Sequence, residues 1–169
     1  PDGLYFTSVD IDNNNPLNAW VTVAGLEDGE HVYHTLDGGE SWINITYNLP
    51  NLPVNCIVHR DNSLYNTIYV GTDIGIYYTD DNISGWLPYS ENIPNVIISD
   101  LEIHYAEQKL YAATFGRGVW QTDLIVDQMV NVETNQSDLK NLDLILYPNP
   151  NNGVFNLIIN GCKENNLTL

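Results

Sequence analysis

Carboxylates are the most abundant reactive groups in this sequence, with 22 acidic residues among 169. In glycoside hydrolysis they act in pairs about 5–10 Å apart, one protonating the leaving oxygen and the other attacking or activating water. Asp73, Asp80 and Asp100 lie in or near predicted strands, but no spacing pairs any two of them. Asp73 directly follows a strand pattern, so it is the best single candidate for a catalytic carboxylate.

A calcium loop is suggested by the segment Asp10-Ile-Asp12-Asn-Asn14, which begins like an EF-hand. An EF-hand loop needs glycine at its sixth position for a sharp turn and glutamate at its twelfth as a bidentate ligand. Asn15 and Val21 occupy these two positions here. The sequence therefore excludes an EF-hand and leaves only a weak surface calcium site open.

The four histidines do not form a metal-binding pattern. His31 and His34 are three positions apart, and this spacing places them on opposite faces of a strand because side chains alternate. His59 and His104 align as equivalent strand ends and are expected to be packing residues. No convincing Ser/His/Asp order, phosphate loop or Cys/His spacing is present. We therefore predict no metal ion and no cofactor.

The charge balance restricts the partners of the chain. Five basic residues against 22 acidic ones give a formal net charge of −17. Nucleic acids and anionic membranes both attract clustered Lys and Arg, so we predict that the chain binds neither. No run of 18 apolar residues exists, which predicts no membrane span. Cys56 and Cys162 fall in different predicted domains, so no disulfide is expected between them.

An internal repeat determines the predicted fold. Four pairs of identical residues are each 44 positions apart: Thr35 and Thr79, Asp37 and Asp81, Trp42 and Trp86, and Pro50 and Pro94. A period in the forties that is carried by strands is typical of a stacked or radial repeat architecture. The strands that must position the candidate residues therefore belong to repeated units.

The predicted strands group into units of four. They are 5–12, 19–25, 31–35 and 41–45; then 56–59, 67–71, 75–79 and 86–89; then 100–104, 110–114 and 118–122. Four antiparallel strands per unit is typical of a β-propeller blade. About two and a half blades cannot close a ring, so we predict an all-β, incomplete β-propeller whose N-terminal blades lie outside this chain. Asp73 could then point into the ring opening, and Gly71, Ala112 and Ala113 are expected where strands crowd a central axis.

A known turn motif lies within the first group of four predicted strands. Residues 35–42 fit the pattern Ser or Thr, x, Asp, x, Gly, x, Ser or Thr, Trp, which is known as the Asp-box, and a worn second copy follows at 79–86. The aspartate can accept backbone hydrogen bonds within its own turn, so we interpret it as structural rather than catalytic or metal-binding. The tryptophan is expected to pack between blades and donate its indole N–H. The predicted structural residues are Thr35, Asp37, Gly39, Ser41, Trp42, Thr79, Asp81 and Trp86.

Residues 5–124 resemble the closing blades of Asp-box (BNR-repeat) β-propellers. Beyond the box, the likeness rests on Tyr69-Val-Gly-Thr-Asp-Ile-Gly-Ile-Tyr77, Ile93-Pro-Asn95 and Leu110-Tyr-Ala-Ala-Thr-Phe-Gly-Arg-Gly-Val-Trp120. Such propellers occur in bacterial sialidases, family 74 glycoside hydrolases, sortilin-like receptors and photosystem assembly factors. A sialidase of this family uses three arginines around the substrate carboxylate. This chain has only Arg60 and Arg117, and Arg117 is interpreted as a turn residue.

A second domain is predicted near the C-terminus. Residues 125–141 are interpreted as a linker, and 142–169 contain two apolar strand patterns around a proline turn. This segment resembles the start of the Ig-like β-sandwich sorting domain of the type IX secretion system. The sequence contains the first strands of that domain and lacks its later strands and Lys-rich end. The matching residues are Tyr147, Pro148, Asn149, Pro150, Gly153 and Phe155.

These resemblances imply a secreted or surface-displayed protein of a Gram-negative bacterium, exported by the type IX secretion machinery. The expected domains are propeller blades at 1–124, a linker at 125–141 and a truncated sorting domain at 142–169. One hypothesis is a non-catalytic platform that binds carbohydrate or protein. The alternative is part of a xyloglucanase-like or sialidase-like glycoside hydrolase whose catalytic residues lie mostly in other blades. A facing carboxylate pair would separate the two hypotheses.

Overall fold

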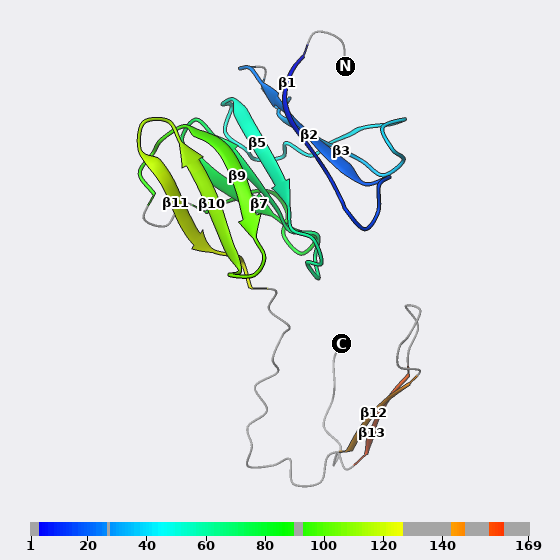
Figure 1. The fold of residues 1–169 in the computed structure, drawn as a ribbon. Coiled ribbons are helices and arrows are strands. Elements are labelled where there is room, and N and C mark those ends of the chain that lie inside the picture. Colours follow the sequence, from blue (N-terminus) through cyan, green and yellow to red (C-terminus); the bar gives the residue numbers. More distant parts are fainter. Residues whose placement is uncertain (1–3, 27, 90–92, 127–142, 148–155, 161–169) are drawn as a thin grey trace. The chain divides into compact units, whose positions relative to one another are not determined.

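The computed structural model of the chain describes residues 4–26, 28–89, 93–126, 143–147 and 156–160. Every regular element in these ranges is a β-strand, which confirms the predicted all-β class (Figure 1). The chain forms two compact units, Pro1–Asp127 and Gln128–Leu169. Each unit is described by itself.

The first unit contains three antiparallel sheets in which each strand pairs with the next one along the chain (Figure 1). The first sheet comprises β1 (Tyr5–Ile11), β2 (Ala19–Ala24), β3 (Val32–Thr35) and β4 (Ile43–Asn44). The second comprises β5 (Val54–His59), β6 (Ile68–Thr72), β7 (Gly75–Thr79) and β8 (Leu87–Pro88). The third comprises β9 (Ile98–His104), β10 (Lys109–Thr114) and β11 (Gly118–Asp123). The fourth strands are shorter than predicted, and Pro88 lacks the N–H that would extend β8.

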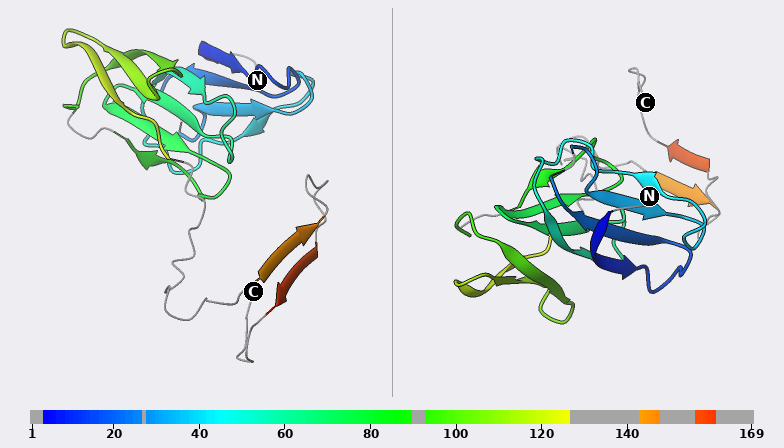
Figure 2. Two further views of the ribbon diagram at one scale, coloured as in Figure 1. Left: turned by 60° about the horizontal axis from the view of Figure 1, so that its bottom comes forward. Right: turned by 90° about the horizontal axis from the view of Figure 1, so that it is seen from above.

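The three sheets lie side by side with their first strands as neighbours (Figure 2). β1 contacts β5, and β5 contacts β9. The second strand of one sheet also packs against the first strand of the next, as β2 does on β5 and β6 on β9. This arrangement of successive four-stranded meanders is that of β-propeller blades.

Gly71 lies at a close approach between two neighbouring sheets. The sequence suggested that small residues in the second strands relieve crowding at a central axis. The structure places Gly71 of β6 directly beneath β9, where an added Cβ would lie 2.6 Å from the Ile98 Cγ2 atom. The position is small because β9 of the next sheet packs on it.

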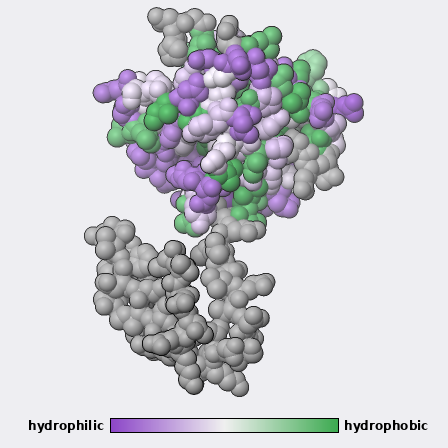
Figure 3. Space-filling model, turned by 180° about the vertical axis from the view of Figure 1, so that it is seen from behind, coloured by the Kyte–Doolittle hydropathy of each residue, from purple (hydrophilic) through white to green (hydrophobic). Residues whose placement is uncertain are grey.

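The surface of the first unit mixes polar and apolar side chains. In the face drawn in Figure 3, hydrophilic residues surround smaller groups of hydrophobic ones. Phe115, in the turn before β11, and Val119, within β11, are both strongly exposed. In the part of the chain that is described, β11 is the edge of the third sheet and pairs only with β10. The third sheet was predicted to lack a fourth strand, and the described residues agree with this prediction.

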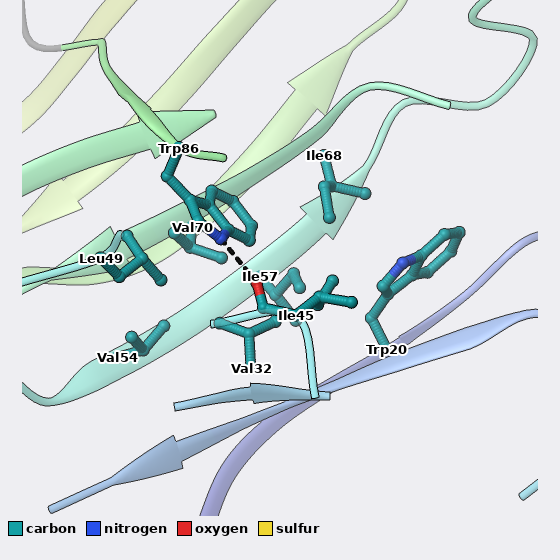
Figure 4. Packing of buried hydrophobic residues seen from close by; sticks show 9 residues of the cluster. All are labelled: Trp20, Val32, Ile45, Leu49, Val54, Ile57, Ile68, Val70 and Trp86. Carbon is teal, nitrogen blue, oxygen red and sulfur yellow. Dashed lines mark hydrogen bonds between the residues drawn. The ribbon is translucent and has the colours of Figure 1, made fainter. Parts of the chain in front are cut away.

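Two hydrophobic clusters hold the sheets together. Trp86 is 1% exposed at the centre of the first cluster, and its Nε1–H donates a hydrogen bond of 2.8 Å to the Ile45 carbonyl oxygen (Figure 4). The cluster joins residues of the first two sheets: Trp20, Val32, Ile45, Leu49, Val54, Ile57, Ile68, Val70 and Trp86. A second cluster joins the second and third sheets: Cys56, Tyr69, Ile76, Ile93, Ile98, Leu101, Leu110, Ala112 and Leu124. The second sheet is thus buried on both faces.

The opposite face of the first sheet is more open. Because side chains alternate along a strand, Val21 and Tyr33 point away from their buried neighbours in the first cluster. Together with Phe6 and Trp42 they line an apolar depression of about 240 Å³. Trp42 was expected to be buried between blades like Trp86, but it is only half-buried. The difference arises because no described sheet covers this face.

The second unit contains one described hairpin. β12 (Asp143–Tyr147) pairs antiparallel with β13 (Asn156–Asn160), with Tyr147 opposite Asn156. Two strands around a proline turn were predicted in this segment. The turn itself lies outside the described residues, as do Cys162, nearly all of the predicted linker, and the motif residues Pro148, Asn149, Pro150, Gly153 and Phe155.

Candidate functional site

The turn at residues 35–42 is held by the side chain of Asp37. Its Oδ1 accepts a hydrogen bond from the Thr35 hydroxyl at 2.7 Å and another from the Ser41 backbone N–H at 2.9 Å. Its Oδ2 accepts from the Ser41 hydroxyl. The Gly39 N–H donates to Thr35 Oγ1 at 2.9 Å, and Gly39 has φ of 94°, which favours glycine. These contacts give the carboxylate a role inside its own turn.

The hydrogen bonds to Asp37, first of all those from Ser41, lower its pKa from 3.8 to about 2. The ionised carboxylate therefore stabilises the fold above pH 3.8, and this contribution disappears as the pH falls through about 2. We expect Asp37→Asn to lower the urea midpoint at neutral pH and to weaken the loss of stability between pH 4 and 2. Glu40→Gln in the same turn is the control. An unchanged acid dependence in Asp37→Asn would contradict this role.

The second copy of the turn is held differently. The Asp81 carboxylate accepts a hydrogen bond from the Asn66 side chain rather than from its own turn. The Thr79 hydroxyl donates to the Gly85 carbonyl at 2.7 Å, closing the turn. Asn48, which follows the first sheet, then fixes Trp86. Its side chain accepts a hydrogen bond from the Trp86 backbone N–H and donates one to the Trp86 carbonyl at 3.0 Å. The second turn therefore depends on contacts outside itself.

An open cavity of about 640 Å³ lies beside this second turn. Both the first and the second sheets contribute to its walls. The buried side chains of Trp20 and Ile68 belong to its floor, and Tyr47 on its border is 64% exposed. The remaining lining residues are Asn18, His34, Leu36, Ile45, Asn48, Asn66, Thr79, Asp80, Asp81, Ile83, Ser84 and Gly85.

The cavity has both apolar and polar walls, and its lining carries no positive charge. Asp80 and Asp81 supply carboxylates, and its lining residues, all of them described, include no Lys or Arg. Burial lowers the pKa of His34 below its usual 6.5, so this ring is neutral at pH 7. His34 Nε2 is hydrogen-bonded to Asn18 Oδ1, which requires the Nε2–H tautomer. The site therefore suits a neutral or cationic ligand better than an anion.

Tyr47 is the aromatic ring that a ligand in this cavity can reach. Trp20 is 2% exposed and stacks on both His34 and His59, at ring-centroid distances of 4.9 and 4.5 Å, so its indole is closed to a ligand. Tyr47 has φ of 44°, a left-handed conformation that is uncommon for a large side chain. Such conformations cluster at ligand sites, where the surrounding structure maintains them.

Two of the candidate carboxylates, Asp73 and Asp80, do not lie together. Asp73 lies in the β6–β7 turn, where its Oδ1 accepts a hydrogen bond of 3.0 Å from the Asn55 side chain. Asp80 follows the other end of β7, so the strand separates these two residues by roughly 20 Å at about 3.3 Å per residue. This exceeds the separation that glycoside hydrolysis uses. Asp100 lies within β9, where its Oδ1 accepts from the Leu101 N–H.

The other singled-out residues have separate surroundings. His31 is buried and its Nε2 is 3.1 Å from Asn51 Oδ1, while His34 lines the cavity, so the two histidines do not form a joint site. The Arg60 side chain donates to the Ile125 carbonyl. The Arg117 carbonyl accepts from the Trp120 indole at 3.1 Å. Cys56 is a buried free thiol as predicted, and burial raises its pKa to about 12.

His59 has features that sequence reasoning missed. It is buried and stacked on Trp20, as expected of a packing residue. However, neither ring nitrogen has a hydrogen-bond partner among the described residues, and Asp12 and Asp61 lie beside it. Asp12 directly follows β1 of the first sheet and His59 ends β5 of the second, so only the docking of the two sheets brings them together.

Comparisons with known proteins support the fold. No family model and no curated protein matches the chain. Among solved structures, YCF48 from Cyanidioschyzon merolae, a β-propeller protein, matches with a TM-score of 0.52 and 16% identity over 73% of this chain. The match spans 35% of the length of that protein. At this identity the likeness shows the fold alone, which is propeller-like.

No helix in the described part of the chain has the length and apolar character needed to cross a membrane.

Proposed function

We propose that the first unit is a non-catalytic binding platform for neutral carbohydrate, with the cavity between the first and second sheets as the binding site. The observation that carries this proposal is the combination of the exposed Tyr47 ring with a border of amides and carboxylates in one cavity of about 640 Å³. A cavity of that volume accommodates a ligand of two to three sugar rings in size.

The chemistry of the lining favours a sugar. The apolar face of a pyranose ring packs on an aromatic ring such as Tyr47, and its hydroxyls are both donors and acceptors. Asn48 and Asn66 are already held by the protein, Asn48 through Trp86 and Asn66 through Asp81. They therefore present polar atoms in fixed positions. The net charge of −17 and the lack of cationic lining residues disfavour acidic sugars.

We expect Tyr47→Ala to weaken binding of neutral oligosaccharides by about tenfold, which is about 1.4 kcal/mol. A glycan array would select the oligosaccharide, and calorimetric titration would measure its affinity. Tyr5→Ala is the matched control, because Tyr5 is also strongly exposed but does not line the cavity. Equal losses in both variants, or binding only of cationic peptides, would overturn the carbohydrate assignment.

A glycoside hydrolase section is the second candidate. Asp80 and Asp81 support it because both carboxylates line the same cavity. They are adjacent in one turn, and Asp81 is already hydrogen-bonded to Asn66. Release of reducing ends from the selected oligosaccharide, and its loss in Asp80→Asn, would favour the hydrolase over the platform.

We also propose export through the type IX secretion system to the medium or the cell surface. The support is the motif from Tyr147 to Phe155 together with a hairpin that brackets it, β12 and β13. In a Gram-negative host with this system, deleting residues 142–169 is expected to remove the chain from the medium and retain it in the cell. Equal export with and without the segment would contradict the proposal.

A further inference from the structure

We propose that Asp12, His59 and Asp61 form a binding site for a divalent transition-metal ion, with Zn²⁺ as the ion that the donor set fits best. One ligand atom from each side chain lies within 4.8 Å of the others. The site lies where the ends of two first strands meet, since Asp12 directly follows β1 and His59 ends β5. It adjoins the proposed carbohydrate cavity, because Asn18 and Trp20 of that cavity contact Asp12 and His59, but the metal proposal does not rest on carbohydrate binding.

The spacing of the donors is close to that of a metal site. His59 Nδ1 is 3.7 Å from Asp61 Oδ1. Two ligands that are each about 2.1 Å from a tetrahedral ion are about 3.4 Å apart. A movement of a few tenths of an ångström would therefore let both atoms contact one ion. The third donor, the Asp12 carboxylate, is only partly buried and can adjust to complete the site.

The histidine is the observation that points to a ligand. Its side chain is 4% exposed, yet neither ring nitrogen is hydrogen-bonded to another described group. Leaving a buried polar group without a partner costs about 1–3 kcal/mol, so such groups usually have a role. The ring cannot turn freely, because it is stacked on Trp20 with 23° between the planes. A metal ion would give the buried nitrogen its missing partner.

The carboxylates are oriented by their neighbours. Asp61 Oδ2 accepts a hydrogen bond of 2.7 Å from the Asn13 side chain, and the Asp61 N–H donates to the Tyr105 hydroxyl at 2.9 Å. Asp12 Oδ1 accepts from the Asn14 N–H at 2.8 Å. Outer contacts of this kind fix the orientation of metal ligands. A cavity of about 160 Å³ borders His59 and Asp61, which leaves room for a water as a fourth ligand.

The donor set selects the class of ion. Two carboxylate oxygens and one imidazole nitrogen suit Zn²⁺ and neighbouring transition ions. Ca²⁺ prefers six to eight oxygen ligands, which three side chains and one nitrogen do not supply. The donors therefore differ from the EF-hand pattern that Asp10 to Asn14 suggested, although Asp12 belongs to both.

The test is a calorimetric titration of the untagged, chelator-treated 169-residue chain with Zn²⁺. We expect one equivalent to bind, and Ca²⁺ to bind at least about a hundredfold more weakly. Asp12→Asn and Asp61→Asn should each weaken Zn²⁺ binding by at least about tenfold, since even the loss of an outer contact to a metal ligand costs about that much. Both substitutions are conservative and outside the hydrophobic clusters, so far-UV circular dichroism should remain unchanged.

Two controls separate a built site from surface binding. His104→Gln changes the equivalent histidine of the third sheet, which is exposed and outside the cluster. Asp28→Asn removes an exposed carboxylate elsewhere. Neither should alter Zn²⁺ affinity. No binding, or binding that Asp12→Asn and Asp61→Asn leave unchanged, would overturn the proposal.

Discussion

Replacing Trp86 with alanine is expected to lower the free energy of unfolding by about 3–5 kcal/mol, the range for removing a large buried aromatic side chain. Trp86 fills the space between the first two sheets and is 1% exposed. Its removal leaves a cavity among residues that belong to different sheets. It also leaves the Ile45 carbonyl oxygen without the indole N–H that it accepts at 2.8 Å. Urea unfolding followed by circular dichroism would measure the loss.

Trp42 provides the matched control for this experiment. It occupies the same position in the preceding repeat, but it is only half-buried against Phe6, Val21 and Tyr33. Trp42→Ala should therefore cost clearly less than Trp86→Ala. Equal costs would mean that the tryptophan stabilises its own turn, and not the contact between sheets.

The strands could be predicted because each is bounded by residues that turn the chain. Asn13 to Pro16 separates β1 from β2, and Asp37 to Gly39 follows β3. Trp42 and Trp86 define the period of the repeat, so the strand positions of one repeat predict those of the next. Strand and turn patterns of this kind depend on residues that are close in sequence, so a single sequence is enough to recognise them.

The candidate sites could not be predicted, because they depend on how one sheet docks on another. Asp12 and His59 are in different repeats, and no periodicity relates a turn of one unit to a strand end of the next. Tyr47 likewise borders a cavity that exists only because the first two sheets pack together. The sequence placed His59 correctly in a packed environment, but it did not indicate that the ring nitrogens lack partners there.

Gly71→Ala is expected to lower the free energy of unfolding by about 1–3 kcal/mol, the usual cost of overpacking a core. In a strand, alanine ordinarily stabilises relative to glycine, so a loss must come from the crowding of the added Cβ against its neighbours. The added Cβ would lie 2.5 Å from Cys56 Sγ, 2.6 Å from Ile98 Cγ2 and 2.8 Å from Ile98 Cβ. Ile98 cannot move away easily, because it is fully buried in β9. Urea unfolding of both chains would measure the difference.

A double-mutant cycle with Cys56→Ala tests the origin of this cost. Cys56→Ala removes the sulfur atom that lies closest to the new methyl group. Gly71→Ala should therefore cost less in that background than in the wild-type chain, with a coupling of about 0.5–3 kcal/mol for residues in contact. Strictly additive costs would show that the methyl group does not meet the Cys56 sulfur atom of the paired strand β5. In that case the cost of Gly71→Ala would come from Ile98 of β9 alone.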